Sequence, residues 1–136
     1  MRNIVCLTFI TAVLLLTACS KDKKSERFRL LTTTAWINES VLVDGEEPAG
    51  DWDFLNEFSG EAKFNEDGTG NFGNYTGQWR FNETETEITI TTETIPLPIV
   101  TRIIELTSER LEISTVTLNP QNPSETAEIT MIFKSR

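Results

Sequence analysis

The stretch Ala62-Lys63-Phe64-Asn65-Glu66-Asp67-Gly68-Thr69-Gly70-Asn71-Phe72 predicts a β-hairpin. Ala62 and Phe64 alternate with polar residues ahead of the Asp67-Gly68 pair, and Phe72 follows on the partner strand. An Asp-Gly pair between alternating apolar residues is a strong hairpin signal, because tight turns require a positive φ that glycine adopts freely. Antiparallel β structure is therefore the starting point for the rest of the chain.

The same two-residue alternation recurs after the hairpin, in short segments separated by turn residues. Trp79 and Phe81 share one face of a strand, and Ile88 and Ile90 share a face of the next. The prolines of residues 95–98 then mark a connection or a sheet edge, since proline cannot pair within a central strand.

Three further strands are predicted over residues 100–106, 111–118 and 127–133. In the second of them the apolar parity changes between Ile113 and Val116, which predicts a β-bulge near Ser114-Thr115. A loop over residues 119–123 leads into the last strand.

The N-terminal part of the domain differs in pattern. Residues 28–34 are compatible with a helical turn or with an irregular approach segment, and residues 37–43 predict the first strand. Residues 44–60 form a long connection in which the spacing of Leu55 and Phe58 predicts one or two helical turns. The segments add up to about eight strands, an all-β chain that forms a small closed barrel or a sandwich.

Leu16-Thr17-Ala18-Cys19 follows a basic start (Arg2) and an apolar run over residues 4–16. This pattern is typical of a secretory signal and is too short for a membrane span. An ordinary cleavage site that contains a cysteine is the alternative to a lipidation site. Seven polar residues, 20–26, then predict a flexible tether.

Composition excludes several functions. Loss of Arg2 with the signal takes the net charge from −9 to −10, which argues against binding to nucleic acid. The chain has no histidine, and its only cysteines are Cys6 and Cys19, so the domain offers no histidine base, no Cys–His pair and no His/Cys zinc site. Carboxylate-only hydrolysis stays open, although no acidic pair stands out.

The chain resembles the small lipocalin-like lipoproteins of two-membrane bacteria. The resemblance covers residues 29–134 and rests on the order of short motifs: Thr33-Thr34-Ala35-Trp36, residues 64–70, Thr76-Gly77-Gln78-Trp79-Arg80-Phe81, residues 88–90 and residues 104–111. It implies an all-β, eight-stranded antiparallel up-and-down barrel with a long capping loop after the first strand.

The resemblance also implies a domain organisation. Residues 1–18 would be a lipoprotein signal peptide, 19–27 the lipidated Cys19 with its tether, and 28–136 the barrel domain. Ser20, in place of the aspartate that retains lipoproteins at the inner membrane, implies the outer membrane. No cofactor is implied.

Candidate ligand-binding residues are the aromatic side chains expected inside the barrel and in the long connection. A filled core with Trp36 at the barrel base is the alternative to a pocket for an apolar molecule. A cap over the barrel end is the alternative to a ligand-gating lid. The candidates are Trp36, Trp52, Phe54, Phe58, Phe64, Trp79 and Phe81.

Two polar stretches contain residue types that bind ions in other proteins. Asp51, Asp53 and Glu57 carry oxygen ligands suited to Ca²⁺, but their spacing does not fit an EF-hand, and a solvated acidic loop is the simpler interpretation. Residues 67–70 resemble a phosphate loop but lack its lysine and helix, which favours a turn. We therefore expect no metal site.

Three functional hypotheses follow. The first is a non-enzymatic envelope lipoprotein, held in the membrane by lipid on Cys19, that binds a small apolar or amphipathic ligand or acts as an accessory module. The second is a protein-interaction module, such as an inhibitor of a basic, envelope-directed hydrolase like lysozyme. The third is a carboxylate-dependent hydrolase.

Overall fold

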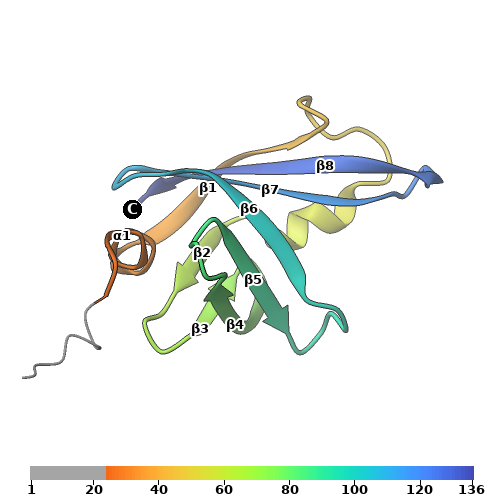
Figure 1. The fold of residues 1–136 in the computed structure, drawn as a ribbon. Helices are drawn as coiled ribbons and strands as arrows, with labels where there is room; N and C mark the ends of the chain where they lie inside the picture. The colour runs from red at the N-terminus through yellow and green to blue at the C-terminus, as the bar shows by residue number, and fades with distance from the viewer. Residues whose placement is uncertain (1–23) are drawn as a thin grey trace, which may run out of the picture.

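A computed structural model describes residues 24–136, so the expected signal peptide, Cys19 and most of the tether lie outside the described residues. The described residues form one α-helix, one short 3₁₀ helix and eight strands (Figure 1). In chain order they are α1 (Glu26–Thr33), β1 (Ala35–Val43), η2 (Asp53–Phe58), β2 (Glu61–Phe64), β3 (Thr69–Phe72), β4 (Tyr75–Phe81), β5 (Glu87–Thr92), β6 (Ile99–Leu106), β7 (Arg110–Asn119) and β8 (Asn122–Ser135).

Each strand pairs with its sequence neighbours, and β8 returns to pair with β1. All the pairs are antiparallel, which confirms the predicted eight-stranded up-and-down barrel. The predicted hairpin between β2 and β3 is also confirmed, and only Gly68 in its turn has a positive φ (89°). Residues 24–136 thus contain the complete barrel together with the helix packed against it.

α1 closes one end of the barrel. Leu31 is fully buried, and its carbonyl accepts a hydrogen bond of 3.0 Å from Nε1–H of Trp36, which is also fully buried. The ring of Phe28 packs against Trp79 with centroids 5.6 Å apart. The core at this end therefore combines the helix with side chains from several strands.

The helix begins within the segment predicted as a tether. Ser25 is the N-cap: its Oγ accepts from the backbone N–H of Phe28 at 3.0 Å and donates to Glu85 Oε2 at 2.7 Å. Arg27 Nε–H donates to the Glu85 carbonyl at 2.9 Å. The folded domain thus extends before residue 28, because these polar residues tie the helix to the β4–β5 turn.

The barrel is split at the opposite end on two sides. The β1–β2 ladder stops at Ile37↔Glu61, whereas β1 stays paired with β8 up to Val43. The β6–β7 ladder stops at Arg102↔Ser114, whereas β7 stays paired with β8 up to Asn119. Beyond these points, β7, β8 and β1 therefore form a three-stranded extension that diverges from β6, as Figure 1 shows.

A bulge in β1 keeps that extension apolar on its inner face. The register shifts between Asn38 and Ser40, so the inward positions change from even to odd along the strand. Val41 and Val43 consequently pack with Trp52 and the buried β8 residue Ile129.

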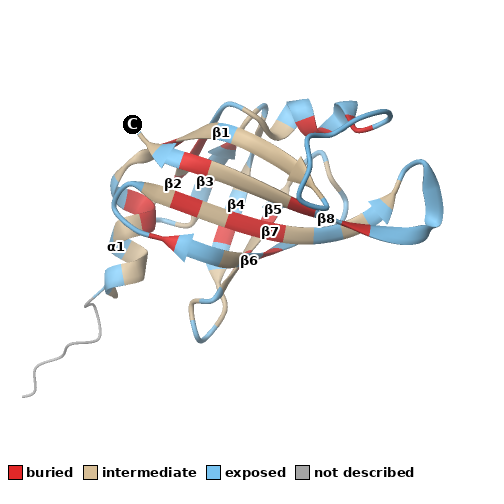
Figure 2. Ribbon diagram, turned by 90° about the horizontal axis from the view of Figure 1, so that it is seen from above, coloured by how far each residue is buried: buried red, intermediate tan, exposed pale blue. Residues whose placement is uncertain are grey.

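The predicted bulge near Ser114-Thr115 is wrong. The β7–β8 register runs without a break from Arg110 to Leu118, and the shift in β6 lies between Ile103 and Glu105 instead. Val116 and Leu118 expose 63% and 62% of their surface. They lie towards the tip of the β7–β8 hairpin, which is exposed (Figure 2). In this half of β7 the inward positions lie outside the packed core. Polar residues can therefore occupy them, and the apolar residues fall at the alternate positions.

Candidate functional site

The split end of the barrel holds a cavity of about 700 Å³. Its walls come from both halves of the barrel and from η2, and its lining contains no charged side chain. Most lining residues are apolar; they include Phe54, Phe58, Phe64, Ile95, Leu97, Val100, Ile113, Val116 and Ile129. A cavity of this size, apolar with few polar groups, has the properties of a small-molecule site.

Four hydroxyl groups supply the polar part of the lining. Thr101, which is buried, donates to the Ile88 carbonyl at 3.2 Å, and Thr115 donates to the Val100 carbonyl at 2.8 Å. The hydroxyls of Tyr75 and Thr117 form no hydrogen bond with the other described residues and remain available to a ligand.

η2 fills the split between β1 and β2. The backbone N–H of Asn74 donates to the Glu57 carbonyl at 2.8 Å, and the Asn74 side chain donates to Glu57 Oε2 at 2.9 Å. Phe58 packs against Tyr75 with ring centroids 4.7 Å apart. These contacts fix η2 to the β3–β4 turn, so the predicted helical turns of the connection form one wall of the cavity.

The split between β6 and β7 has no such cover among the described residues. Leu97 and Val100 on one side and Val116 on the other line the cavity and expose 73%, 49% and 63% of their surface. Large exposed apolar side chains that gather at an opening are typical of a ligand or partner site. This split is the mouth of the cavity.

The structure divides the candidate aromatic residues into two groups. Phe54, Phe58 and Phe64 line the cavity. Trp36, Trp79 and Phe81 belong to the core at the closed end, where Trp79 also donates to the Asn65 carbonyl at 2.9 Å. Trp52 is buried just before η2, against Ala127 and Ile129.

Sequence reasoning missed the contributions of Thr115 and Thr117 on β7 and of the β5–β6 connection. Thr115 and Thr117 continue the inward parity of Leu111 and Ile113, and this continuity was the available signal.

Charge is distributed unevenly along the barrel axis. The long connection and the β5–β6 connection at the open end contain no lysine or arginine. None of their acidic residues forms an ion pair within residues 24–136. These are Asp44, Glu46, Glu47, Asp51, Asp53, Glu57 and Glu93.

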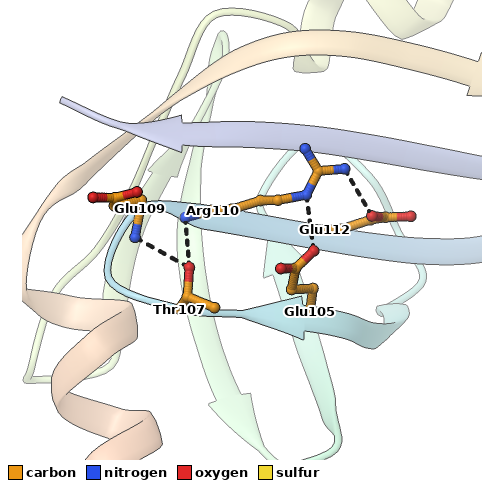
Figure 3. Close-up of polar contacts among 5 residues, drawn as sticks. All are labelled: Glu105, Thr107, Glu109, Arg110 and Glu112. Carbon is orange, nitrogen blue, oxygen red and sulfur yellow. Dashed lines mark hydrogen bonds and ion pairs between the residues drawn. The ribbon is translucent and has the colours of Figure 1, made fainter.

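Several basic side chains towards the closed end are paired with acids, Arg110 among them. Figure 3 shows Arg110 donating to Glu105 and Glu112, at 2.9 and 3.0 Å. The hydrogen bond with Glu112 is the main cause that raises the pKa of the Arg110 guanidinium above its ordinary value. Thr107 Oγ1 shapes the turn by accepting from the backbone N–H groups of Glu109 and Arg110.

The two candidate ion sites have ordinary structural explanations. Within residues 24–136 there is no group of three or more His, Cys, Asp or Glu side chains that could hold a metal ion, so Asp51, Asp53 and Glu57 are not brought together. The Asp67 carboxylate accepts from the N–H and hydroxyl of Thr69 at 3.0 and 2.6 Å, so these donors complete a turn motif within the chain. No helix in the described part of the chain has the length and hydropathy to cross a membrane.

No protein-family model and no curated protein sequence matches the chain. Among solved structures, the barrel is similar to bovine odorant-binding protein in complex with a selenium-containing odorant, with a TM-score of 0.48 and 12% identity over 87% of this chain and 78% of that one. It is similar to the same bovine protein in complex with its natural ligand, with a TM-score of 0.48 and 12% identity over 85% and 77% of the two chains.

Proposed function

We propose that this chain is a lipid-anchored binding protein of the cell envelope that holds a small apolar molecule in its lipocalin-like barrel. The observation that carries the proposal is the cavity of about 700 Å³, lined almost entirely by apolar side chains and open between β6 and β7. An apolar molecule that moves from water into such a lining gains about 25 cal/mol per Å² of buried surface.

The lining favours binding over a chemical reaction. Its polar groups are the hydroxyls of three threonines and Tyr75, and it contains no carboxylate, lysine or arginine. Such groups orient a bound molecule through hydrogen bonds, whereas general acid–base catalysis needs a group that exchanges protons near neutral pH.

The position of the start of α1 supports a membrane anchor on Cys19. Ser25 and Arg27 bind the β4–β5 turn at the closed end, whereas the cavity opens at the other end. A tether that leaves from the closed end would direct the mouth away from the anchoring membrane. Ser20 beside Cys19 supports the outer membrane as that membrane.

Binding is tested with N-phenyl-1-naphthylamine, an uncharged probe whose fluorescence rises in apolar surroundings, and the soluble chain 20–136. Thr117→Phe fills an inward, cavity-lining position, and Leu118→Phe adds the same ring at the next, outward position. We expect Thr117→Phe to weaken binding by about tenfold or more and Leu118→Phe to leave it unchanged. Absence of binding to the parent chain, or equal binding by both variants, would contradict the proposal.

Anchoring is tested separately in a two-membrane bacterial host. Labelled palmitate should be incorporated into the full chain and should be lost, together with membrane association, in Cys19→Ala. Ser20→Asp should move the protein from the outer to the inner membrane fraction. Retention of label in Cys19→Ala would show that the lipid is not on Cys19.

A further inference from the structure

We infer that Tyr75 selects the ligand of this cavity, and that the ligand is an uncharged amphiphile whose carbonyl oxygen, from a ketone or an ester, accepts a hydrogen bond from the Tyr75 hydroxyl. This inference rests on the proposed function and adds the chemical class of the ligand. It depends on an uncharged lining, on a hydroxyl without a partner among the described residues, and on the packing that holds its ring.

The floor of the cavity is apolar. Phe64, Ile113 and Phe133 line the cavity and also belong to the core at the closed end. The hydroxyl of Thr101, which is buried, already donates to the Ile88 carbonyl at 3.2 Å. The apolar body of a ligand therefore occupies this part, and its polar group must find a partner nearer the open end.

The lining favours an uncharged polar group. Among the described residues, those that line the cavity include no charged side chain. A carboxylate or an ammonium group inside the cavity would be buried without a charged partner, which is strongly unfavourable. A carbonyl oxygen needs only one hydrogen-bond donor to offset the loss of its contact with water.

Two hydroxyls of the lining can donate to a ligand. A hydroxyl carries a single donor proton, and those of Thr101 and Thr115 are directed to the carbonyls of Ile88 and Val100. Tyr75 and Thr117 have no hydrogen-bond partner among the other described residues. A phenol is more acidic than an aliphatic alcohol and is therefore the stronger donor to a carbonyl oxygen.

The Tyr75 side chain points into the barrel. Tyr75 lies directly opposite Phe72 in the β3–β4 pair, and residues opposite one another in an antiparallel pair share a face. Phe72 is buried, and both residues line the cavity. The first residue of β4 therefore presents its phenol to the open end of the cavity rather than to the outer face.

The Tyr75 ring is held in place before a ligand arrives. It packs on Phe58 with ring centroids 4.7 Å apart. The neighbours of these two residues are also joined, because the backbone N–H of Asn74 donates to the Glu57 carbonyl at 2.8 Å. A donor that is already positioned loses little conformational freedom when it binds, and this preserves the affinity that the hydrogen bond contributes.

Tyr75 is better shielded from water than Thr117. The β6–β7 ladder stops at Ser114, so Thr117 lies beside the mouth, where water competes for its hydroxyl. Tyr75 instead packs against η2, which fills the split between β1 and β2. A hydrogen bond is stronger in surroundings of low dielectric constant, and Tyr75 is therefore the main anchor.

The inference is tested by competition against N-phenyl-1-naphthylamine on the chain 20–136 and its Tyr75→Phe variant, which lacks only the hydroxyl. The competitors are methyl nonyl ketone and the alkene of the same shape in which a methylene group replaces the carbonyl oxygen. We expect the ketone to bind the variant about three- to tenfold more weakly than the parent, and the alkene to bind both equally.

Thr115→Val is the matched control. It deletes a hydroxyl from the same lining, but one that already donates to the Val100 carbonyl at 2.8 Å. The affinities of the ketone and of the alkene should therefore both stay unchanged. Urea unfolding of the two variants checks that each is folded.

Decanoate tests the exclusion of charge. It carries the same nonyl chain as the ketone, with a carboxylate in place of the acetyl group. We expect decanoate to bind the parent chain roughly tenfold more weakly than the ketone at neutral pH, or more weakly still, because its charge has no partner in the lining.

The outcomes separate the two proposals. Four results would each overturn the role of Tyr75 or the ligand class while the apolar cavity stands: equal ketone affinity in the parent and Tyr75→Phe, an equal loss for the alkene, an equal loss in Thr115→Val, or decanoate binding as tightly as the ketone. Failure of both the ketone and the alkene to displace the probe would overturn the proposed function, and this inference with it.

Discussion

The indole Nε1–H of Trp36 donates a hydrogen bond of 3.0 Å to the carbonyl oxygen of Leu31, and neither residue exposes any surface. The bond joins the last turn of α1 to the start of β1 inside the core of the closed end. It fixes the helix across this end of the barrel, and the cavity lies at the opposite end.

Trp36→Phe should destabilise the barrel by about 1–3 kcal/mol, because the Leu31 carbonyl would stay buried without its partner. Urea unfolding of the variant and the parent measures the loss. Trp52→Phe is the control, because Trp52 is also buried but its indole N–H has no hydrogen-bond partner among the described residues. Equal losses in the two variants would contradict a specific role for the Trp36 bond.

Ser25→Ala should lower stability by about 1 kcal/mol, because it removes the N-cap of α1 as well as the bond to Glu85. Ser20 lies in the same polar segment before the helix and serves as the control position in the chain 20–136. Chemical denaturation of both alanine variants tests the expectation. A neutral Ser25→Ala would mean that the segment before residue 28 is a tether after all.

Periodicity was enough to predict the strands and their antiparallel order, since each strand alternates between interior and exterior positions. The split end could not be predicted in this way. Whether β6 stays paired with β7 beyond Ser114 depends on how the bulges between Asn38 and Ser40 and between Ile103 and Glu105 redirect the strands. A bulge leaves little trace in a single sequence.

The sequence likewise predicted only part of the candidate site. Aromatic residues identify apolar interiors, so Phe54, Phe58 and Phe64 were found together with Trp36 and Trp79. Sequence cannot separate a cavity wall from a packed core, because both need apolar inward side chains. The separation depends on α1, which fills one end and leaves the other open.

Val116→Thr and Leu118→Thr should each change stability by less than about 0.5 kcal/mol, because both side chains are mostly exposed. Ile113→Ala, at a buried position of the same strand, should cost about 2–5 kcal/mol. Urea unfolding of the three variants checks the register. Large losses of stability in the Val116 and Leu118 variants would instead support the β-bulge that the sequence predicted.

Asp67 should make stability depend on pH in the acid range. Its hydrogen bonds with Thr69 hold the pKa of the carboxyl below the ordinary value of 3.8. The charged form therefore stabilises the fold above the ordinary pKa, and this contribution is lost as the pH falls through the lowered one. The stability difference between parent and Asp67→Ala should be present at neutral pH and disappear in strong acid.

The neighbouring Glu66→Ala controls for general acid effects, because the Glu66 side chain accepts no hydrogen bond from the described residues. Denaturant unfolding across the acid range provides the measurement. A difference between parent and Asp67→Ala that persists unchanged in strong acid would show that the ionised carboxylate does not stabilise the turn.

Gly73 should be essential for the position of η2 and therefore for ligand binding. Its φ is +62°, and a Cβ atom there would lie 2.2 Å from the Glu57 carbonyl oxygen and 2.8 Å from the Phe58 Cα. Gly73→Ala must therefore displace the wall that carries Phe58, as well as straining the turn by about 1 kcal/mol. We expect weaker binding of N-phenyl-1-naphthylamine in addition to reduced stability.

Gly60→Ala, between η2 and β2 at the end of the long connection, separates the two effects. Gly60 has a φ of +107°, but a Cβ atom there meets nothing within 4 Å. The substitution should therefore reduce stability through backbone strain and leave probe affinity unchanged. If Gly73→Ala likewise lost stability but kept its affinity, η2 could not be a wall of the binding site, because its displacement would leave the ligand undisturbed.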